Sequence, residues 1–127
     1  MIKSFDHVAI TVKDLDKTIA WYVKHLGFSV KRTFEIKERG IRVAFLGVAD
    51  QAMLELLGFI DLERAVEGPT LKFEETGIKH VSFFVDDLDG ICQHLKSIGV
   101  EFTKFFPDRV AFKDLNGIVV ELRVSTD

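Results

Sequence analysis

Cysteine is almost absent from this sequence, because Cys92 is the only one among 127 residues, and it cannot close an internal disulfide. No charged and then apolar leader precedes the first strand-like segment at residues 5–12. Together these absences predict a reducing, cytoplasmic setting. Long apolar runs are also missing: none approaches the roughly 20 residues that a membrane-spanning helix needs. We therefore expect no membrane insertion.

The sequence also lacks an excess of charge of either sign. Seventeen basic and twenty acidic side chains give a formal net charge of −3, which offers no electrostatic footprint for nucleic acid. Gly-x-Gly-x-x-Gly and P-loop motifs are absent, so nothing indicates a dinucleotide or nucleoside triphosphate site. We expect a small-molecule substrate and no nucleic-acid partner.

What is present is a repeat within a chain of single-domain length, 1–127, whose 47% hydrophobic residues suffice for a core. The segment His-Val-Ala-Ile-Thr-Val-Lys-Asp-Leu-Asp that starts at His7 matches His-Val-Ser-Phe-Phe-Val-Asp-Asp-Leu-Asp, which starts at His80, in six of ten positions. Similar pairs follow in the same order: Leu26-Gly27 with Ile98-Gly99, Val43-Ala-Phe45 with Val110-Ala-Phe112, and Glu55-Leu56 with Glu121-Leu122. The sequence predicts two tandem modules, at about 1–58 and 78–127, joined by a connector at 59–77.

Each module has the pattern of a strand, a helix and three further strands. Asp14 and Asp87 are the expected N-caps of the helices, and Gly27 and Gly99 the expected stops. The later strands are expected at residues 29–36, 41–47 and 52–57 and at residues 101–106, 110–113 and 117–124. Residues 70–75 of the connector can form one helical turn. This pattern predicts an α+β fold of two βαβββ modules.

Four side chains recur at equivalent places: a histidine at each first strand and a glutamate in each last strand. Strand alternation turns these residues, His7, Glu55, His80 and Glu121, away from their apolar neighbours. An ionised carboxylate in such surroundings is costly unless it is paired or binds a cation. If the two modules converge about a pseudo-twofold axis, two imidazoles and two carboxylates meet, and these donors suit Ni, Zn, Co, Mn or Fe.

The other titratable groups have structural explanations. His25 and His94 fall on the polar side or at the ends of helices, where solvated or capping roles are usual. Cys92 is expected to be buried in the second helix and inert. Two pairs of acidic residues stand at the helix starts, where they act as caps and dipole partners: Asp14 with Asp16, and Asp87 with Asp89.

These residues resemble the vicinal oxygen chelate superfamily, which includes glyoxalase I, methylmalonyl-CoA epimerase, extradiol dioxygenases and resistance proteins. The most specific similarities are the segments 6–16, Trp21-Tyr22 through Phe28, 53–56, 78–81 and 114–122. The ligand order His7, Glu55, His80, Glu121 is similar to that of bacterial glyoxalase I, whereas the epimerase usually carries Gln in place of Glu55. The resemblance implies that the modules form a curved mixed sheet around a metal-containing cleft.

The resemblance also implies a function. For glyoxalase I this is proton transfer through a metal-bound enediolate of a 2-oxoaldehyde thiol adduct, with Glu55 or Glu121 as the base. An acyl-CoA epimerase is the first alternative, because residues 40–46 and 71–73 look epimerase-like. A non-catalytic protein that binds a drug or another small molecule is the second. Small two-module members are usually homodimers, and Arg42, Arg64 and Arg109 are candidate anion anchors.

Overall fold

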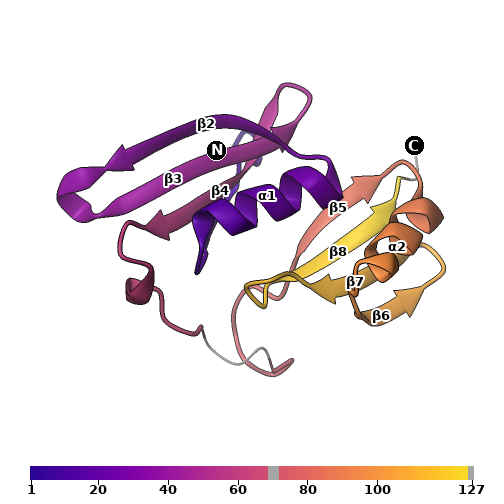
Figure 1. Ribbon diagram of the computed structural model, residues 1–127. Helices are drawn as coiled ribbons and strands as arrows, with labels where there is room; N and C mark the ends of the chain where they lie inside the picture. Colours follow the sequence, from indigo (N-terminus) through magenta and orange to yellow (C-terminus); the bar gives the residue numbers. More distant parts are fainter. Residues whose placement is uncertain (69–71, 126–127) are drawn as a thin grey trace. The chain divides into compact units, whose positions relative to one another are not determined.

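The computed structural model describes residues 1–68 and 72–125 of the chain, which divides into two compact units, Met1–Glu67 and Gly68–Asp127 (Figure 1). Within the described residues, each unit contains one α-helix and one four-stranded mixed sheet. This arrangement confirms the predicted α+β class with tandem βαβββ modules. The boundary between the units lies inside the predicted connector.

The first unit consists of a sheet with one helix against it. Its elements are β1 (Val8–Thr11), α1 (Leu15–Leu26), β2 (Ser29–Ile36), η1 (Lys37–Arg39), β3 (Ile41–Val48), β4 (Gln51–Phe59) and η2 (Leu62–Arg64). The strand order is β1-β4-β3-β2; β1 runs parallel to β4, and the other neighbours are antiparallel. The first and last strands of this module are therefore direct neighbours, although residues 12–50 lie between them in sequence.

Local signals fix the ends of α1. The Asp14 carboxylate accepts a hydrogen bond from the Lys17 N–H at 3.1 Å, and Gly27 closes the helix in the left-handed region at φ 76°. The helix packs on the sheet, and Gly58 in β4 allows a close approach, because a Cβ there would lie 2.8 Å from the Leu15 Cβ. The helix side of the sheet therefore holds the fully buried core of this unit: Tyr22, Leu46, Leu54 and Leu56.

The second unit repeats the first. Its elements are β5 (Val81–Val85), α2 (Leu88–Ser97), β6 (Phe102–Phe106), β7 (Arg109–Lys113) and β8 (Val119–Val124), in the strand order β5-β8-β7-β6. Strand β5 is parallel to β8, as β1 is to β4. Asp87 caps α2 by accepting from the Gly90 N–H at 2.9 Å. The core of this unit contains Leu95, Val110, Phe112, Val120 and Leu122, all at most 2% exposed.

Several predicted boundaries differ from the structure. The first strand begins at Val8 rather than at residue 5, because β1 has β4 as its partner and that pairing starts at Val8 and Leu54. The last strand begins at Val119, because the Asp114 carboxylate accepts from the Asn116 and Ile118 N–H groups and holds a turn there. The predicted turn at 70–75 lies partly outside the described residues; the Glu75 N–H bonds the Lys72 carbonyl. No described helix is long and apolar enough to cross a membrane.

Candidate metal centre

His7 and Glu55 meet on the face of the first sheet that is turned away from α1. The parallel register places Ala9 beside Glu55, so His7 stands two residues ahead of that partner position. Leu54 and Leu56 fill the core on the helix side, and strand alternation therefore turns Glu55 to the opposite face. The His7 Nε2 lies 3.7 Å from the Glu55 Oε1.

The neighbours of His7 hold its ring in place. Its Nδ1 contacts the Asp6 carboxylate, and the edge of its ring meets Phe45 with centroids 5.4 Å apart. The hydrogen bond with Asp6 raises the pKa of His7 above 6.5, and the Glu55 charge adds to this, while partial burial opposes it. Surroundings that favour a positive imidazole also favour a divalent cation, which competes with the proton for Nε2.

His80 and Glu121 form the equivalent pair in the second unit. Ser82 is the register partner of Glu121, so His80 again stands two residues ahead of it. The His80 Nε2 lies 3.9 Å from the Glu121 Oε2, and the Ser82 hydroxyl donates to the Glu121 Oε1 at 3.1 Å. The two modules thus bring a histidine and a glutamate together by the same register, as their repeated sequence predicts.

Arginines surround Glu121, whereas Glu55 lies beside Phe45 in the register. The Arg123 Nε is 3.5 Å from one carboxylate oxygen of Glu121, and the Arg109 Nε is 3.8 Å from the other. The Arg109 guanidinium also stacks on the Phe106 ring at 4.1 Å. Arg123 was absent from the predicted anion anchors, although its position two residues after Glu121 on the same strand is a readable signal.

The donor atoms of both pairs fit a divalent transition metal. Imidazole nitrogen and carboxylate oxygen are ordinary ligands of zinc, nickel and similar ions. Two donors that bind one ion at about 2.1 Å lie roughly 3.0 Å apart in an octahedron and roughly 3.4 Å apart in a tetrahedron. The 3.7 and 3.9 Å separations would therefore close by less than about 1 Å. In the described residues, no group of three or more His, Cys, Asp or Glu side chains is placed so that it could hold a metal ion, and the meeting of the two pairs stays a prediction.

The remaining sequence candidates lie away from these pairs. His25 stands in the last turn of α1 with its ring edge against Trp21, and His94 is exposed on α2. Cys92 is buried as predicted, and burial raises the pKa of its thiol, so little reactive thiolate forms.

Arg42 binds the Asp16 carboxylate at 2.9 and 3.2 Å. Arg64 donates to the Arg39 carbonyl and stacks on Phe59, so of the three predicted anchors Arg109 is the one beside a His–Glu pair.

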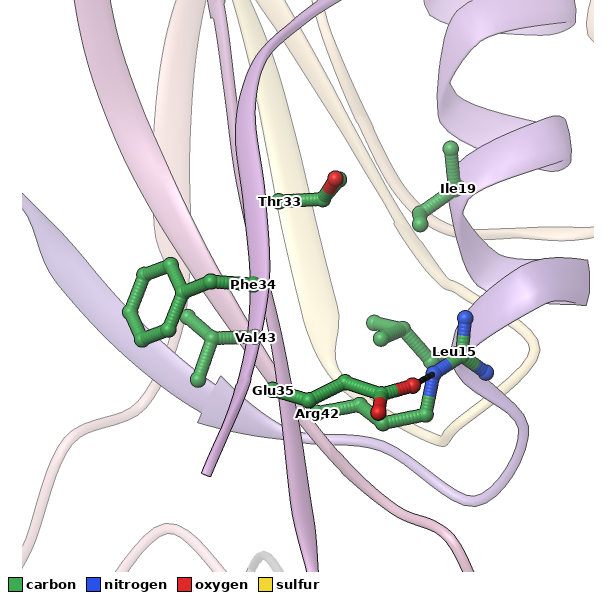
Figure 2. A pocket seen from close by; sticks show the side chains of 7 residues that line it. All are labelled: Leu15, Ile19, Thr33, Phe34, Glu35, Arg42 and Val43. Carbon is green, nitrogen blue, oxygen red and sulfur yellow. Dashed lines mark ion pairs between the residues drawn. The ribbon is translucent and has the colours of Figure 1, made fainter. Parts of the chain in front are cut away.

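A small pocket of about 100 Å³ lies between α1 and strands β2 and β3 (Figure 2). Its lining residues are Leu15, Ile19, Thr33, Phe34, Glu35, Arg42 and Val43. Figure 2 shows the ion pair between Glu35 and Arg42 at this pocket, with the Phe34 and Val43 side chains directed away from α1. The pocket is well below the roughly 300 Å³ of small ligand sites, and neither His7 nor Glu55 lines it, so we do not assign the chemistry to it.

Comparison with known proteins gives the family. Residues 4–122 match the Glyoxalase/Bleomycin resistance protein/Dioxygenase superfamily, and the chain belongs to it. A probable lactoylglutathione lyase of Vibrio parahaemolyticus is 32% identical over 126 residues, covering 91% of this chain and 86% of the relative. The mitochondrial methylmalonyl-CoA epimerase of Homo sapiens is 32% identical over 91 residues, covering 72% of this chain and 51% of the epimerase.

Solved structures agree on the fold. The trypanothione-dependent glyoxalase I of Leishmania major superposes with a TM-score of 0.82 over 97% of this chain and 87% of that one, at 23% identity. At that identity the likeness shows the fold alone. The superfamily contains both glyoxalase-like and epimerase-like relatives of this chain at about 30% identity, and its members are often metal-dependent enzymes.

Proposed function

We propose that this chain is a metal-dependent lyase or isomerase of glyoxalase I type, which moves a proton within a small 2-oxoaldehyde thiol adduct. The observation that carries the proposal is the repeated pairing of His7 with Glu55 and of His80 with Glu121 in one register. Two nitrogen and two oxygen ligands leave open positions for substrate oxygens on Ni, Zn, Co, Mn or Fe.

The chemistry divides between the ion and the two glutamates. When bound, a divalent cation supplies a Lewis acid for the negative charge that develops on adjacent substrate oxygens. Glu55 or Glu121 takes the proton from the carbon beside the carbonyl and returns it to the neighbouring carbon. Ser82 and two arginines hold Glu121, whereas the described contact of the Glu55 carboxylate is with His7 alone.

An acyl-CoA epimerase is the second candidate, supported by the 32% identity to the human methylmalonyl-CoA epimerase. It would use the same cation and the same glutamates but return the proton to the other face of the same carbon. Its usual ligand set has Gln at the position of Glu55, and for this reason we rank it second. A protein that only sequesters a small molecule would need neither carboxylate as a base.

The test loads the purified chain with Ni²⁺, Co²⁺ or Zn²⁺ and measures two reactions. One is isomerisation of the methylglyoxal hemithioacetal with several thiols, and the other is deuterium exchange into methylmalonyl-CoA. Glu55→Gln and Glu121→Gln should each lower the rate, and the one that removes the base should do so by roughly 10²- to 10⁴-fold. Glu38→Gln in η1 is the matched control and should keep the wild-type rate. Metal-loaded protein that is inactive in both assays would contradict an enzymatic function.

We also propose a cytoplasmic homodimer that binds a small-molecule substrate. The support is the lone buried Cys92, which suits a reducing compartment, and the resemblance to two-module family members. Light scattering of the purified chain should give twice the 14.4 kDa mass of one chain. A monomer at micromolar concentration would contradict this part of the proposal.

A further inference from the structure

Arg109 and Arg123 stand directly opposite each other on neighbouring strands β7 and β8. Arg123 follows Glu121 by two residues, so both side chains lie on the same face of β8. Like charges opposite each other in an antiparallel pair repel. Anions close by offset this repulsion.

The structure supplies two such anions, and one of them is a predicted metal ligand. The Asp108 carboxylate accepts from the Arg109 Nη1 at 2.9 Å and lies 3.8 Å from the Arg123 Nη2. Glu121 bridges both arginines through their Nε atoms at 3.8 and 3.5 Å. The positive charges of Arg109 and Arg123 are therefore balanced by the negative charges of Asp108 and Glu121, as long as the Glu121 carboxylate contacts both arginines.

A metal on Glu121 would upset this balance. A divalent cation that engages the carboxylate adds two positive charges beside both guanidinium groups, and these then face an uncompensated charge. The arginine side chains are 31% and 42% exposed, so their remaining N–H donors are accessible to a ligand. Stacking on Phe106 also limits the movement of the Arg109 guanidinium.

We propose that Arg109 and Arg123 bind an oxyanion of the substrate beside Glu121, and that metal binding at Glu121 strengthens this site. The proposal deepens the proposed function, and its second part rests on that function, because metal binding can strengthen the oxyanion site only if Glu121 is a metal ligand. The oxyanion is a carboxylate or a phosphate on the thiol part of the substrate. A planar guanidinium binds either anion with two parallel hydrogen bonds. The pair would thus select anionic substrates over neutral ones.

The first experiment measures metal and anion binding by calorimetry in the wild type and in two variants. Arg109→Gln and Arg123→Gln should weaken malonate or inorganic phosphate binding to the Zn²⁺ form by roughly tenfold each, since each removes charge-assisted hydrogen bonds. The same variants should bind Zn²⁺ more tightly, because a repelling charge beside Glu121 is gone. Simple damage to the fold would weaken both, so the opposite signs distinguish the proposal from a structural role.

Arg64→Gln is the matched control. Arg64 also stacks on a phenylalanine, Phe59, at 4.4 Å, but it bonds the Arg39 carbonyl rather than Glu121. Both affinities should stay within about twofold of the wild type, because the described contacts of Arg64 are with Arg39 and Phe59 of the first unit. The anion that binds more tightly, malonate or phosphate, identifies the source of the oxyanion. Equal anion affinity in the wild type and both arginine variants would overturn the proposal.

A second experiment needs no metal and therefore separates the two proposals. Glu121→Gln removes the bridging carboxylate charge and should release both arginines in the metal-free chain. Malonate or phosphate should then bind roughly tenfold more tightly than to the metal-free wild type. If Zn²⁺ does not bind the wild type, the proposed function fails, and this variant still decides the oxyanion site. Unchanged anion affinity in Glu121→Gln would overturn the oxyanion site whatever the metal result.

Discussion

The two histidines of the candidate metal centre have different neighbours. His7 follows Asp6, whose carboxylate contacts its Nδ1, whereas His80 follows Lys79, whose ammonium donates to the carbonyls of Lys72 and Glu75. A carboxylate on Nδ1 orients the imidazole so that its Nε2 can serve as a ligand. Among the described contacts, a carboxylate therefore supports the histidine Nδ1 only in the first module.

Because of this support, we expect Asp6→Asn to weaken metal binding. Loss of an outer carboxylate costs roughly 10- to 100-fold in metal affinity, and the exposure of Asp6 favours the lower end. Titration with Zn²⁺ followed by calorimetry measures the change. Asp50→Asn, at the turn between β3 and β4, is the matched control. Equal affinity in the two variants would show that Asp6 does not support the ligand.

Among the secondary-structure elements, both helices begin with an aspartate cap that the sequence predicted. Asp14 and Asp87 accept from the backbone N–H groups of Lys17 and Gly90. Replacing either aspartate with alanine should lower the free energy of unfolding by about 0.5–2 kcal/mol, because an N–H of the first turn loses its partner. Urea unfolding measures this. The asparagine variants keep an acceptor and should stay close to the wild type; an equal loss in both would exclude capping as the cause.

Helix α1 is also linked to β3 by the pair of Asp16 and Arg42. The hydrogen bond from Arg42 holds the pKa of Asp16 below 3.8. Because the folded pKa is lower than the unfolded one, the pair stabilises the fold above about pH 4, and the effect is lost as pH falls through the folded pKa. Arg42→Gln should cost at most about 1 kcal/mol at pH 7, since the pair is exposed. Urea unfolding should give a smaller difference from the wild type at pH 3 than at pH 7; an equal difference would exclude the ion pair.

For the whole molecule, the number of metal ions per chain tests whether the two His–Glu pairs act together. If His7, Glu55, His80 and Glu121 form one site, each chain binds one metal ion. If the two pairs act independently, each chain binds two. We expect one ion per chain by elemental analysis. Either His7→Ala or His80→Ala should lower the metal affinity by more than roughly 100-fold, because loss of a direct ligand weakens binding more than loss of a group that only supports a ligand. His94→Ala, an exposed histidine on α2, is the control. Two ions per chain, with one retained after either change, would refute the shared site.

The sequence could predict much of the fold because its signals are local or repeated. The duplicated His–Val start and Glu–Leu end identified both modules, and Gly27 marked the end of α1 at its positive φ. Burial of Thr18 could not be read from hydrophobicity. It is fully buried in α1 because its hydroxyl donates to the Asp14 carbonyl at 2.8 Å and so satisfies its polar group within the helix.

By itself, the sequence determined which face of its strand each ligand candidate occupies, because side chains alternate with a period of two. Only the tertiary structure decided which strands are neighbours. The parallel pairing of β1 with β4 and of β5 with β8 joins segments distant in sequence, and it sets each His–Glu distance. The antiparallel pairing of β7 with β8 places Arg109 beside Arg123 and Glu121. The register of this hairpin depends on the turn at Asp114 and on core packing rather than on either strand alone.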